Sequence, residues 1–369
     1  MTKHKVLVQP SGREFSVPAG QPVLVAALAA GITLPHGCKN GACGSCKGKV
    51  LSGVVHHGPH GEAALSAAEE AGGFALFCCA IAQTDLVIEA RITAALDGIV
   101  PHKMPARIEH IDWAAKDVAV LTLKLPATEH LKYRAGQYVD FILPNGVRRS
   151  YSIASMPDGN GPIEFHIRHM PGGTFTDALF GMTNPMVRER GILRLEGPLG
   201  TFFLREGDAE PIVLLASGTG FAPIKAILET IFAKSLHRDD PATGRRGRPV
   251  LLYWGARTRA DLYMDALPRR WEQEQPNFRY IPVLSEPDGV SGMPETAESA
   301  PPWTGRTGLV HRAVMQDLPD LSGYQVYACG VPIMVQSAHR DFVAHCGLKE
   351  ENFFSDAFVS RADLPASAR

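Results

Sequence analysis

Cysteine spacing near the amino terminus constrains the fold of this chain more than any other feature. Cys38, Cys43 and Cys46 lie in one loop, with four and then two residues between them, and a fourth cysteine follows much later, at Cys78 or Cys79. With this spacing, three thiolates from one tight loop and one from elsewhere can hold a [2Fe–2S] cluster. The chain must therefore fold so that the two segments meet.

The cysteine loop is also rich in glycine, at Gly37, Gly41 and Gly44. Glycine lets a backbone come close to the inorganic sulfurs of a cluster, to which backbone N–H groups can then donate hydrogen bonds. The alternative is a structural zinc site. Such sites usually combine two Cys-x2-Cys pairs, and this loop has one such pair. The pattern therefore favours the cluster.

The choice of the fourth ligand depends on a resemblance to plant-type ferredoxins. In that family an aspartate usually stands seven residues beyond the fourth ligand, and Asp85 has this relation to Cys78 but not to Cys79. We therefore predict that Cys79 is a small buried neighbour of the site. The predicted metal ligands are Cys38, Cys43, Cys46 and Cys78.

The pattern of strands and helices predicts three domains. Residues 1–92 combine β-rich stretches with a short apolar helix, and residues 93–105 lose periodicity, as a linker does. Ser66 and Glu69 have the spacing of a capping box, which should open a second short helix. Residues 106–207 contain short strands separated by turn residues, which is typical of a small antiparallel barrel. In residues 208–369, apolar strands alternate with helices, one of them expected to begin at Ala260, which indicates an α/β domain. Within it, residues 237–249 and 286–305 have the character of surface insertions.

A four-residue motif, Arg149-Ser150-Tyr151-Ser152, ends a predicted strand of the barrel. It matches the Arg-x-Tyr-Ser/Thr motif of the ferredoxin–NADP⁺ reductase superfamily, which this chain resembles. In that family the arginine pairs with the flavin phosphate, the tyrosine packs on the isoalloxazine, and the hydroxyl lies near N5. The resemblance implies that all four residues bind FAD and that Tyr151 and Ser152 take part in the reaction.

A second flavin element is similar to the family's Gly-Gly-x-x-Ser/Thr turn. Gly172, Gly173 and Thr176 match it, and the resemblance implies that they hold the pyrophosphate of FAD. On the preceding strand, His166 and Arg168 share one face. Arg168 is a candidate cofactor contact. His166 is either a cofactor contact or an ordinary surface residue.

The nicotinamide cofactor is expected where the first strand of the α/β domain ends. There, Gly218-Thr219-Gly220 and Pro223 match the Gly-Thr-Gly-x-Ala-Pro turn of the same family, and the turn opens a helix whose N–H groups can face phosphates. Arg257, at the end of the next strand, either contacts a ribose phosphate or is solvated. The cofactor is predicted to be NADH, with NADPH not excluded.

In two further segments, site residues are predicted only from the resemblance. Cys329, Gly330 and Pro332 match the family's Cys-Gly-x-Pro, in which the cysteine lies beside the nicotinamide; the alternative is a small buried thiol. Phe358 stands in a closing aromatic segment and is a candidate flavin cover, although packing into the core would also explain an aromatic residue there.

Taken together, the resemblance implies a β-grasp ferredoxin domain, a six-stranded antiparallel FAD-binding barrel and a parallel-sheet NAD-binding domain. Such reductases pass electrons from NADH through FAD to the cluster and on to a protein acceptor. The order of domains and the closing segment resemble CDP-6-deoxy-Δ3,4-glucoseen reductases, whose partner is a CDP-4-keto-6-deoxysugar 3-dehydratase. Reductase components of ring-hydroxylating dioxygenases and multicomponent monooxygenases are the alternative, and an electron carrier without nicotinamide turnover is another.

Charge and hydropathy limit the possible partners. The chain has 37 Lys and Arg against 38 Asp and Glu, a net charge of −1, so no general affinity for nucleic acid or membranes is expected. The first residues lack an apolar core of signal-peptide length, and no apolar run is long enough to span a bilayer. The expected location is the cytoplasm.

Overall fold

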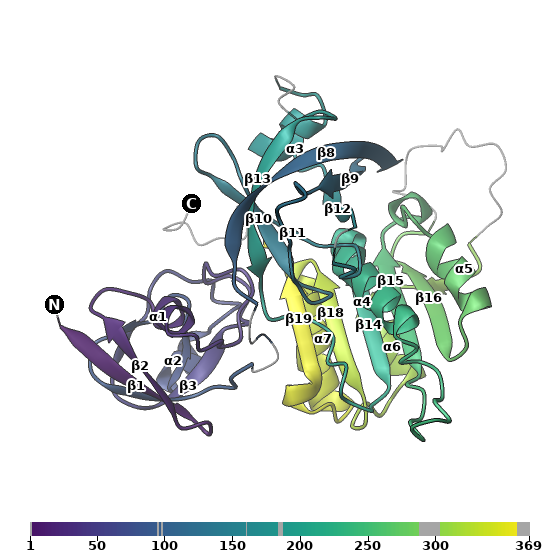
Figure 1. The fold of residues 1–369 in the computed structure, drawn as a ribbon. Helices are drawn as coiled ribbons and strands as arrows, with labels where there is room; N and C mark the ends of the chain where they lie inside the picture. The colour runs from purple at the N-terminus through teal and green to yellow at the C-terminus, as the bar shows by residue number, and fades with distance from the viewer. Residues whose placement is uncertain are drawn as a thin grey trace. The chain divides into compact units, whose positions relative to one another are not determined.

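The structure is a computed structural model that describes residues 2–93, 96, 99–159, 161–183, 187–287 and 303–359. The chain divides into two compact units (Figure 1). The first contains Met1–Ile99 with Gly200–Phe202 and Asp356–Arg369, and the second contains Val100–Leu199 with Phe203–Ser355.

The first unit is built on a five-stranded mixed sheet in the order β2-β1-β7-β3-β5. Strand β1 is antiparallel to β2 and parallel to β7, as the predicted β-grasp fold requires. The elements are β1 (Lys3–Gln9), β2 (Arg13–Pro18), α1 (Val23–Ala29), β3 (Lys47–Ser52), α2 (Ala67–Ala71), β5 (Phe74–Leu76) and β7 (Leu86–Glu89), with a small pair, β4 (Val55–His56) and β6 (Ile81–Ala82).

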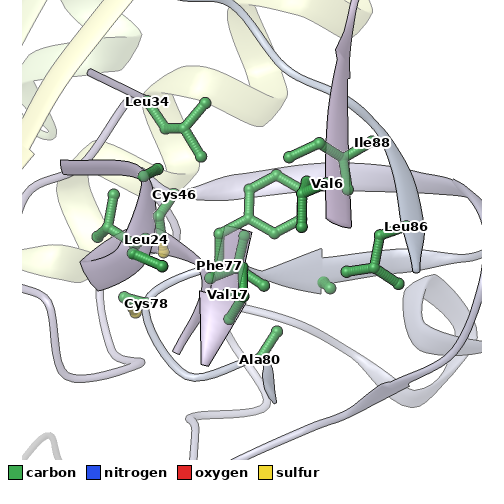
Figure 2. Close-up of a cluster of buried hydrophobic side chains, with 14 of the residues drawn as sticks. Val6, Val17, Leu24, Leu34, Cys46, Phe77, Cys78, Ala80, Leu86 and Ile88 are labelled. Atoms are coloured by element: carbon green, nitrogen blue, oxygen red, sulfur yellow. The ribbon is translucent and has the colours of Figure 1, made fainter. Parts of the chain in front are cut away.

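The core of this unit forms because alternate strand residues point to one face of the sheet. Val6 and Val8 on β1 are completely buried, as is Ile88 on β7, and Leu24 of α1 packs against them in the same cluster. Figure 2 shows this cluster, with Cys46 and Cys78 at its margin. The ligand-bearing segments are thereby anchored to the hydrophobic core.

Helix α2 begins as its sequence predicts. The Ser66 hydroxyl oxygen accepts a hydrogen bond from the Glu69 N–H, and the Glu69 carboxylate accepts one from the Ser66 N–H, which is a complete capping box.

The second unit contains a six-stranded antiparallel barrel in the order β11-β10-β13-β8-β9-β12. A bridge between Ile153 and Phe165 joins the two outer strands and closes it. The strands are β8 (His102–Ala115), β9 (Val118–Lys124), β10 (Tyr138–Ile142), β11 (Arg148–Ser152), β12 (Ile163–Arg168) and β13 (Ile192–Leu199); helix α3 (Thr174–Leu179) follows β12.

The rest of this unit is a six-stranded sheet in the order β17-β16-β15-β14-β18-β19. Strands β14 to β17 and β18 pair in parallel, as expected where helices connect them. The elements are β14 (Ile212–Ser217), α4 (Phe221–Ala233), β15 (Val250–Ala256), α5 (Ala266–Glu274), β16 (Phe278–Leu284), β17 (Arg306–Thr307), α6 (Val310–Asp317), β18 (Gln325–Gly330), α7 (Pro332–His345) and β19 (Phe353–Ala357).

Three sequence expectations differ from what the structure describes. The helix expected from Ala260 is wrong: a single 3₁₀ turn spans Arg259–Asp261 and the α-helix begins at Ala266, because Asp261 caps the turn at Thr258. Residues 102–105, assigned to the linker, lie in β8, where they pair with β13. A surface insertion expected at 286–305 falls mostly outside the described residues.

Within the described ranges, no helix is both long and apolar enough to cross a bilayer.

Candidate functional site

The first two predicted cluster ligands are held facing each other by their own backbone. The Cys38 N–H donates to Cys43 Sγ at 3.4 Å, and the Cys43 N–H donates to Cys38 Sγ at 3.4 Å. A hydrogen bond with the Cys43 thiol lowers the pKa of Cys38 to about 7, although burial opposes the shift. One member of this pair therefore loses its proton readily, as a metal ligand must.

The other two predicted ligands, Cys46 and Cys78, form a second pair. Both are buried, and Figure 2 shows them at the same margin of the core. A hydrogen bond between the two thiols raises the pKa of Cys78 to about 12. Two pairs of thiols fit a group with two irons, each held by one pair. No three His, Cys, Asp or Glu side chains of the described ranges are arranged to hold a single metal ion.

Gly41 in the cysteine loop cannot be replaced without displacing its neighbours. Its φ is +79°, and a Cβ at this position would lie 2.6 Å from the Pro59 carbonyl oxygen and 2.9 Å from Cys79 Sγ. The glycine predicted from the sequence is therefore needed both for conformation and for close approach.

The barrel strand β11 presents two arginines in different electrostatic settings. Arg148 is neutralised, because its guanidinium lies 2.7 Å from Glu196 and 3.4 Å from Asp140. The neighbouring Arg149 donates only to the Arg148 carbonyl oxygen, at 2.9 Å, and forms no ion pair within the part of the chain that the structure describes. Its positive charge thus remains available for an anion such as a flavin phosphate.

Tyr151 lies within an aromatic group of the barrel. Its ring centroid is 4.8 Å from that of Phe141 and 5.5 Å from that of Phe175. Burial raises the pKa of Tyr151 well above its ordinary value, so the phenol stays neutral. On the same strand, Ser150 donates to Asp140 at 2.6 Å, and Ser152 is buried.

The predicted pyrophosphate turn is closed by its own side chains. The Thr176 hydroxyl donates to the Met170 carbonyl oxygen at 2.9 Å, and the Gly172 N–H donates to the Asp177 carboxylate at 3.1 Å. A Cβ at Gly173 would lie 2.5 Å from the Thr176 hydroxyl oxygen. These groups fix the shape of the turn, and this local role is one that the motif alone did not reveal.

The side chain of His166 is completely buried rather than solvated, which corrects the surface alternative. Its Nε2 lies 2.7 Å from Glu164 Oε1, and its Nδ1 lies 2.7 Å from the hydroxyl of Tyr263. Burial lowers the pKa of His166, although its hydrogen bond to the Glu164 carboxylate opposes the shift. The imidazole is therefore neutral, and it links the barrel to the α/β sheet domain.

Lys225 on α4 makes a second link from the sheet domain to the barrel. Its ammonium lies 3.1 Å from Glu164 and 2.7 Å from Glu229, and it donates to the Ala154 carbonyl oxygen at 3.2 Å. Burial raises the pKa of Glu164, but the His166 hydrogen bond and the Lys225 charge together hold it below its ordinary value. The buried ammonium is thus fully compensated.

The predicted nicotinamide turn joins β14 to α4 and packs against the end of β18. A Cβ at Gly220 would lie 2.1 Å from the Cys329 carbonyl oxygen. A Cβ at Gly330, where φ is +142°, would lie 2.1 Å from the Ser217 hydroxyl. Only glycines allow these two turns to approach each other. The turns at Gly218–Gly220 and Gly330 together form a surface without side chains, which we call the glycine cradle.

Trp254 contacts the first turn of this cradle. Its indole N–H donates to the Gly218 carbonyl oxygen at 3.0 Å, and its ring stacks on Phe221 at 4.0 Å between centroids. Gly218 itself has a φ of +52°, and Thr219 beside it is partly exposed.

Arg168 stands over the cradle with unused hydrogen-bonding capacity. Its Nε and Nη2 are buried without a hydrogen-bond partner, and a Cβ at Gly218 would lie 3.9 Å from Nη2. The guanidinium is only loosely paired, at 3.5 Å from Asp117 and 3.8 Å from Asp261. Guanidinium N–H groups without hydrogen-bond partners beside a glycine turn fit a cofactor phosphate.

The remaining predicted residues differ in exposure. Cys329 is completely buried at the end of β18, and Pro332 occupies the first turn of α7. Pro223 is buried within the first turn of α4. Arg257 is exposed beyond β15, which matches the solvated alternative, and Phe358 is partly buried after β19.

Sequence reasoning missed the residues that tie the barrel to the sheet domain. These are Glu164, Lys225, Glu229, Asp261 and Tyr263. A lysine inside a mainly apolar helix was a usable signal, because a buried ammonium requires a partner. Glu229, four residues later on the same helix, could have been inferred as one partner, whereas Glu164 could not, since it lies on a strand of the barrel.

Comparison with known protein families covers most of the chain. Residues 6–83 match the 2Fe-2S iron-sulfur cluster binding domain, residues 105–204 the oxidoreductase FAD-binding domain, and residues 214–340 the oxidoreductase NAD-binding domain. The fold and the sites thus define an iron–sulfur flavoprotein that oxidises a nicotinamide cofactor.

Several relatives match over nearly their whole length. CDP-6-deoxy-L-threo-D-glycero-4-hexulose-3-dehydrase reductase of Yersinia pseudotuberculosis is 40% identical, covering 96% of this chain and 98% of the relative. Reductase component 1 of terephthalate 1,2-dioxygenase from Comamonas is 32% identical, covering 97% and 98%. The crystal structure of the Amycolatopsis cytochrome P450 reductase GcoB has a TM-score of 0.72 at 32% identity, covering 97% and 99%.

This chain belongs to the family of three-domain reductases in which ferredoxin, FAD-binding and NAD-binding domains follow one another. The predicted fold class, the [2Fe–2S] cluster, FAD, the nicotinamide cofactor and the oxidoreductase activity are confirmed. The predicted domain limits and the roles of individual residues stay predictions.

Proposed function

We propose that this reductase supplies electrons to a CDP-4-keto-6-deoxysugar 3-dehydratase. The observation that carries the proposal is the 40% identity to a dehydrase reductase over 98% of that relative, against 32% to an oxygenase reductase at the same coverage. When bound, FAD would supply a group that accepts two electrons from the nicotinamide and releases them singly, and the cluster would supply a carrier of one electron at a time.

The proposed cluster ligands are Cys38 and Cys43 for one iron and Cys46 and Cys78 for the other. The support is the pairing of the thiols through hydrogen bonds. The ligands must lose their protons on binding, and the low pKa of Cys38 favours this loss.

For the flavin, we assign the phosphate contact to Arg149 and the ring contact to Tyr151. Arg149 carries a positive charge that no carboxylate of the described ranges neutralises, whereas Arg148 is paired. Tyr151 is held by its aromatic neighbours and remains a neutral phenol. Ser150, Ser152, Gly172, Gly173 and Thr176 complete the proposed flavin site.

For the nicotinamide cofactor, the glycine cradle would receive the phosphates, with Arg168 above it. Gly220 and Gly330 leave the space, and the orphaned guanidinium N–H groups of Arg168 supply donors. Thr219, Pro223, Cys329 and Pro332 line the same turns and complete the proposed site, together with Gly218. His166 acts as a positioning residue, because both of its ring nitrogens are engaged by protein groups.

The partner can be tested by reconstitution. The purified chain, a CDP-4-keto-6-deoxysugar, its 3-dehydratase and NADH are combined without oxygen, and NADH oxidation and sugar deoxygenation are followed. We expect both to depend on the dehydratase, and both to be lost in a Cys43→Ser variant. If an oxygenase component accelerates NADH oxidation and the dehydratase does not, the oxygenase assignment replaces this one.

Cytochrome c is the control acceptor in the same experiment. Bleaching of the flavin and cluster absorption by NADH, with reduction of cytochrome c, reports that the electron relay works whatever the partner is. A chain that is not bleached by NADH or NADPH would instead be a carrier without nicotinamide turnover.

We also propose a cytoplasmic location. All seven cysteines are free thiols in the structure, which suits a reducing compartment, and the reductase draws on NADH. Fractionation of cells, followed by immunodetection, tests this proposal.

A further inference from the structure

A fifth thiol lies at the cluster site without a role in the proposed ligand set. Cys79 is partly buried, and its Sγ is 3.5 Å from Cys78 Sγ. Two thiolates bound to one tetrahedral metal ion with bonds of about 2.3 Å are separated by roughly 3.8 Å. The second thiol is therefore about as far from the first as two ligands of a single iron are from each other.

The local backbone explains how two adjacent side chains reach one site. In a strand, neighbouring side chains point to opposite faces. Here the chain turns, because the N–H groups of Cys79 and Ala80 both donate to the Leu76 carbonyl oxygen, at 2.9 and 2.8 Å. The carbonyl oxygen of Cys79 also accepts from the Gly58 N–H at 3.2 Å, which fixes the end of the turn.

Both thiols approach the same residue of the ligand loop. The Gly41 backbone donates a hydrogen bond to the Cys78 thiol. A Cβ on Gly41 would lie 2.9 Å from Cys79 Sγ. Cys79 therefore faces the loop that carries Cys38 and Cys43, and it does not point away from the site into solvent.

We infer that Cys79 is a reserve ligand of the [2Fe–2S] cluster, able to take the place of Cys78 at the iron that Cys78 shares with Cys46. The inference rests on the proposed ligand set. The exchange breaks one iron–sulfur bond and forms another, and one proton moves from the Cys79 thiol to Cys78. No electron is transferred, so no oxidant or reductant is needed.

The test compares Cys78→Ala, Cys79→Ala and the double variant in the full-length chain. Iron and acid-labile sulfide are measured after anaerobic reconstitution, with visible circular dichroism and the electron paramagnetic resonance of the dithionite-reduced protein. We expect Cys79→Ala to match the wild type in iron content and spectra. Cys78→Ala should retain a cluster with altered spectra, and the double variant should lose it.

Two results would overturn the inference. In one, Cys78→Ala is as empty of iron as the double variant, so that Cys79 cannot replace Cys78. In the other, Cys79→Ala alone loses the cluster, so that Cys79 is the resident ligand. Bound FAD in each variant shows that the flavin domain is folded, and far-ultraviolet circular dichroism follows the whole chain. A Cys78→Ser variant, which preserves the size of the side chain, guards against a folding defect from the alanine.

A Cys43→Ala variant separates this inference from the proposed ligand set. It is combined with Cys79→Ala, because Cys79 faces the loop that carries Cys43, and the loss of both thiols should empty the site. Retention of a normal cluster in Cys43→Ala/Cys79→Ala would refute the ligand set itself, and the inference would fail with it.

Discussion

The Nδ1 atom of His166 on the barrel lies 2.7 Å from the hydroxyl of Tyr263 in the nicotinamide-binding domain. A neutral imidazole has one N–H donor and one acceptor nitrogen. Because Nε2 faces the Glu164 carboxylate, it carries the proton and donates, and Nδ1 accepts from the phenol. One tautomer thus satisfies both hydrogen bonds of the buried series Glu164–His166–Tyr263, and this series connects the two cofactor-binding domains.

Replacing His166 by phenylalanine should destabilise the second unit. The change leaves the Tyr263 hydroxyl without its acceptor, and the Glu164 carboxylate loses one hydrogen-bond donor. An unsatisfied buried polar group costs about 1–3 kcal/mol. We expect a decrease of this size in the free energy of unfolding, measured by urea denaturation with flavin fluorescence, and a slower NADH-dependent reduction of ferricyanide.

The control for this variant is His110→Phe, at an exposed position of β8. It should leave both quantities close to those of the wild type. Equal effects of the two substitutions would mean that the buried hydrogen bonds of His166 have no special role.

His166 should also make the stability of the protein depend on pH. Burial lowers its pKa below the ordinary value of 6.5, so below this pH the unfolded chain binds a proton that the folded chain does not. The contribution of His166 to the free energy of unfolding is complete above pH 6.5, and it is lost as the pH falls toward the pKa of His166 in the folded protein. In His166→Gln the free energy of unfolding should therefore fall less steeply between pH 6.5 and 5. Identical slopes in denaturation series of variant and wild type would contradict this.

Arg149 and Arg148 form a matched pair for testing the flavin site. Arg149→Ala removes a cation that no carboxylate of the described ranges neutralises, and we expect it to lose FAD during gel filtration. Arg148→Ala breaks an exposed ion pair with Glu196, which is worth about 0–1 kcal/mol, and it should keep its flavin. The ratio of absorbance at 450 and 280 nm measures retained FAD. Flavin loss from Arg148→Ala alone would reverse the assignment.

The glycine cradle predicts a steric effect on nicotinamide binding. A Cβ on Gly220 would lie 2.1 Å from the Cys329 carbonyl oxygen, so Gly220→Ala must move the two turns apart. We expect a higher KM for NADH and a lower melting temperature. Gly207→Ala is the control, because nothing lies within 4 Å of its Cβ position. Unchanged steady-state kinetics in Gly220→Ala would show that the cradle does not determine cofactor binding.

The sequence by itself determined the cofactor classes and the order of the domains. Short motifs such as the spacing of Cys38, Cys43 and Cys46 carry this information because one loop supplies most of the contacts to each group. Local signals also predicted the capping box at Ser66 and the strand–turn–helix around Gly220, since both depend on residues close in the chain.

Only the tertiary structure decided which polar groups are buried and what they contact. His166 could not be distinguished from a surface residue by the pattern of β12, because its partner Tyr263 is far away in the chain. The difference between Arg148 and Arg149 likewise depends on Glu196, which lies on β13 and reaches Arg148 past the intervening strand β10. Long-range pairs of this kind arise from the packing of strands and domains, so a local sequence pattern does not predict them.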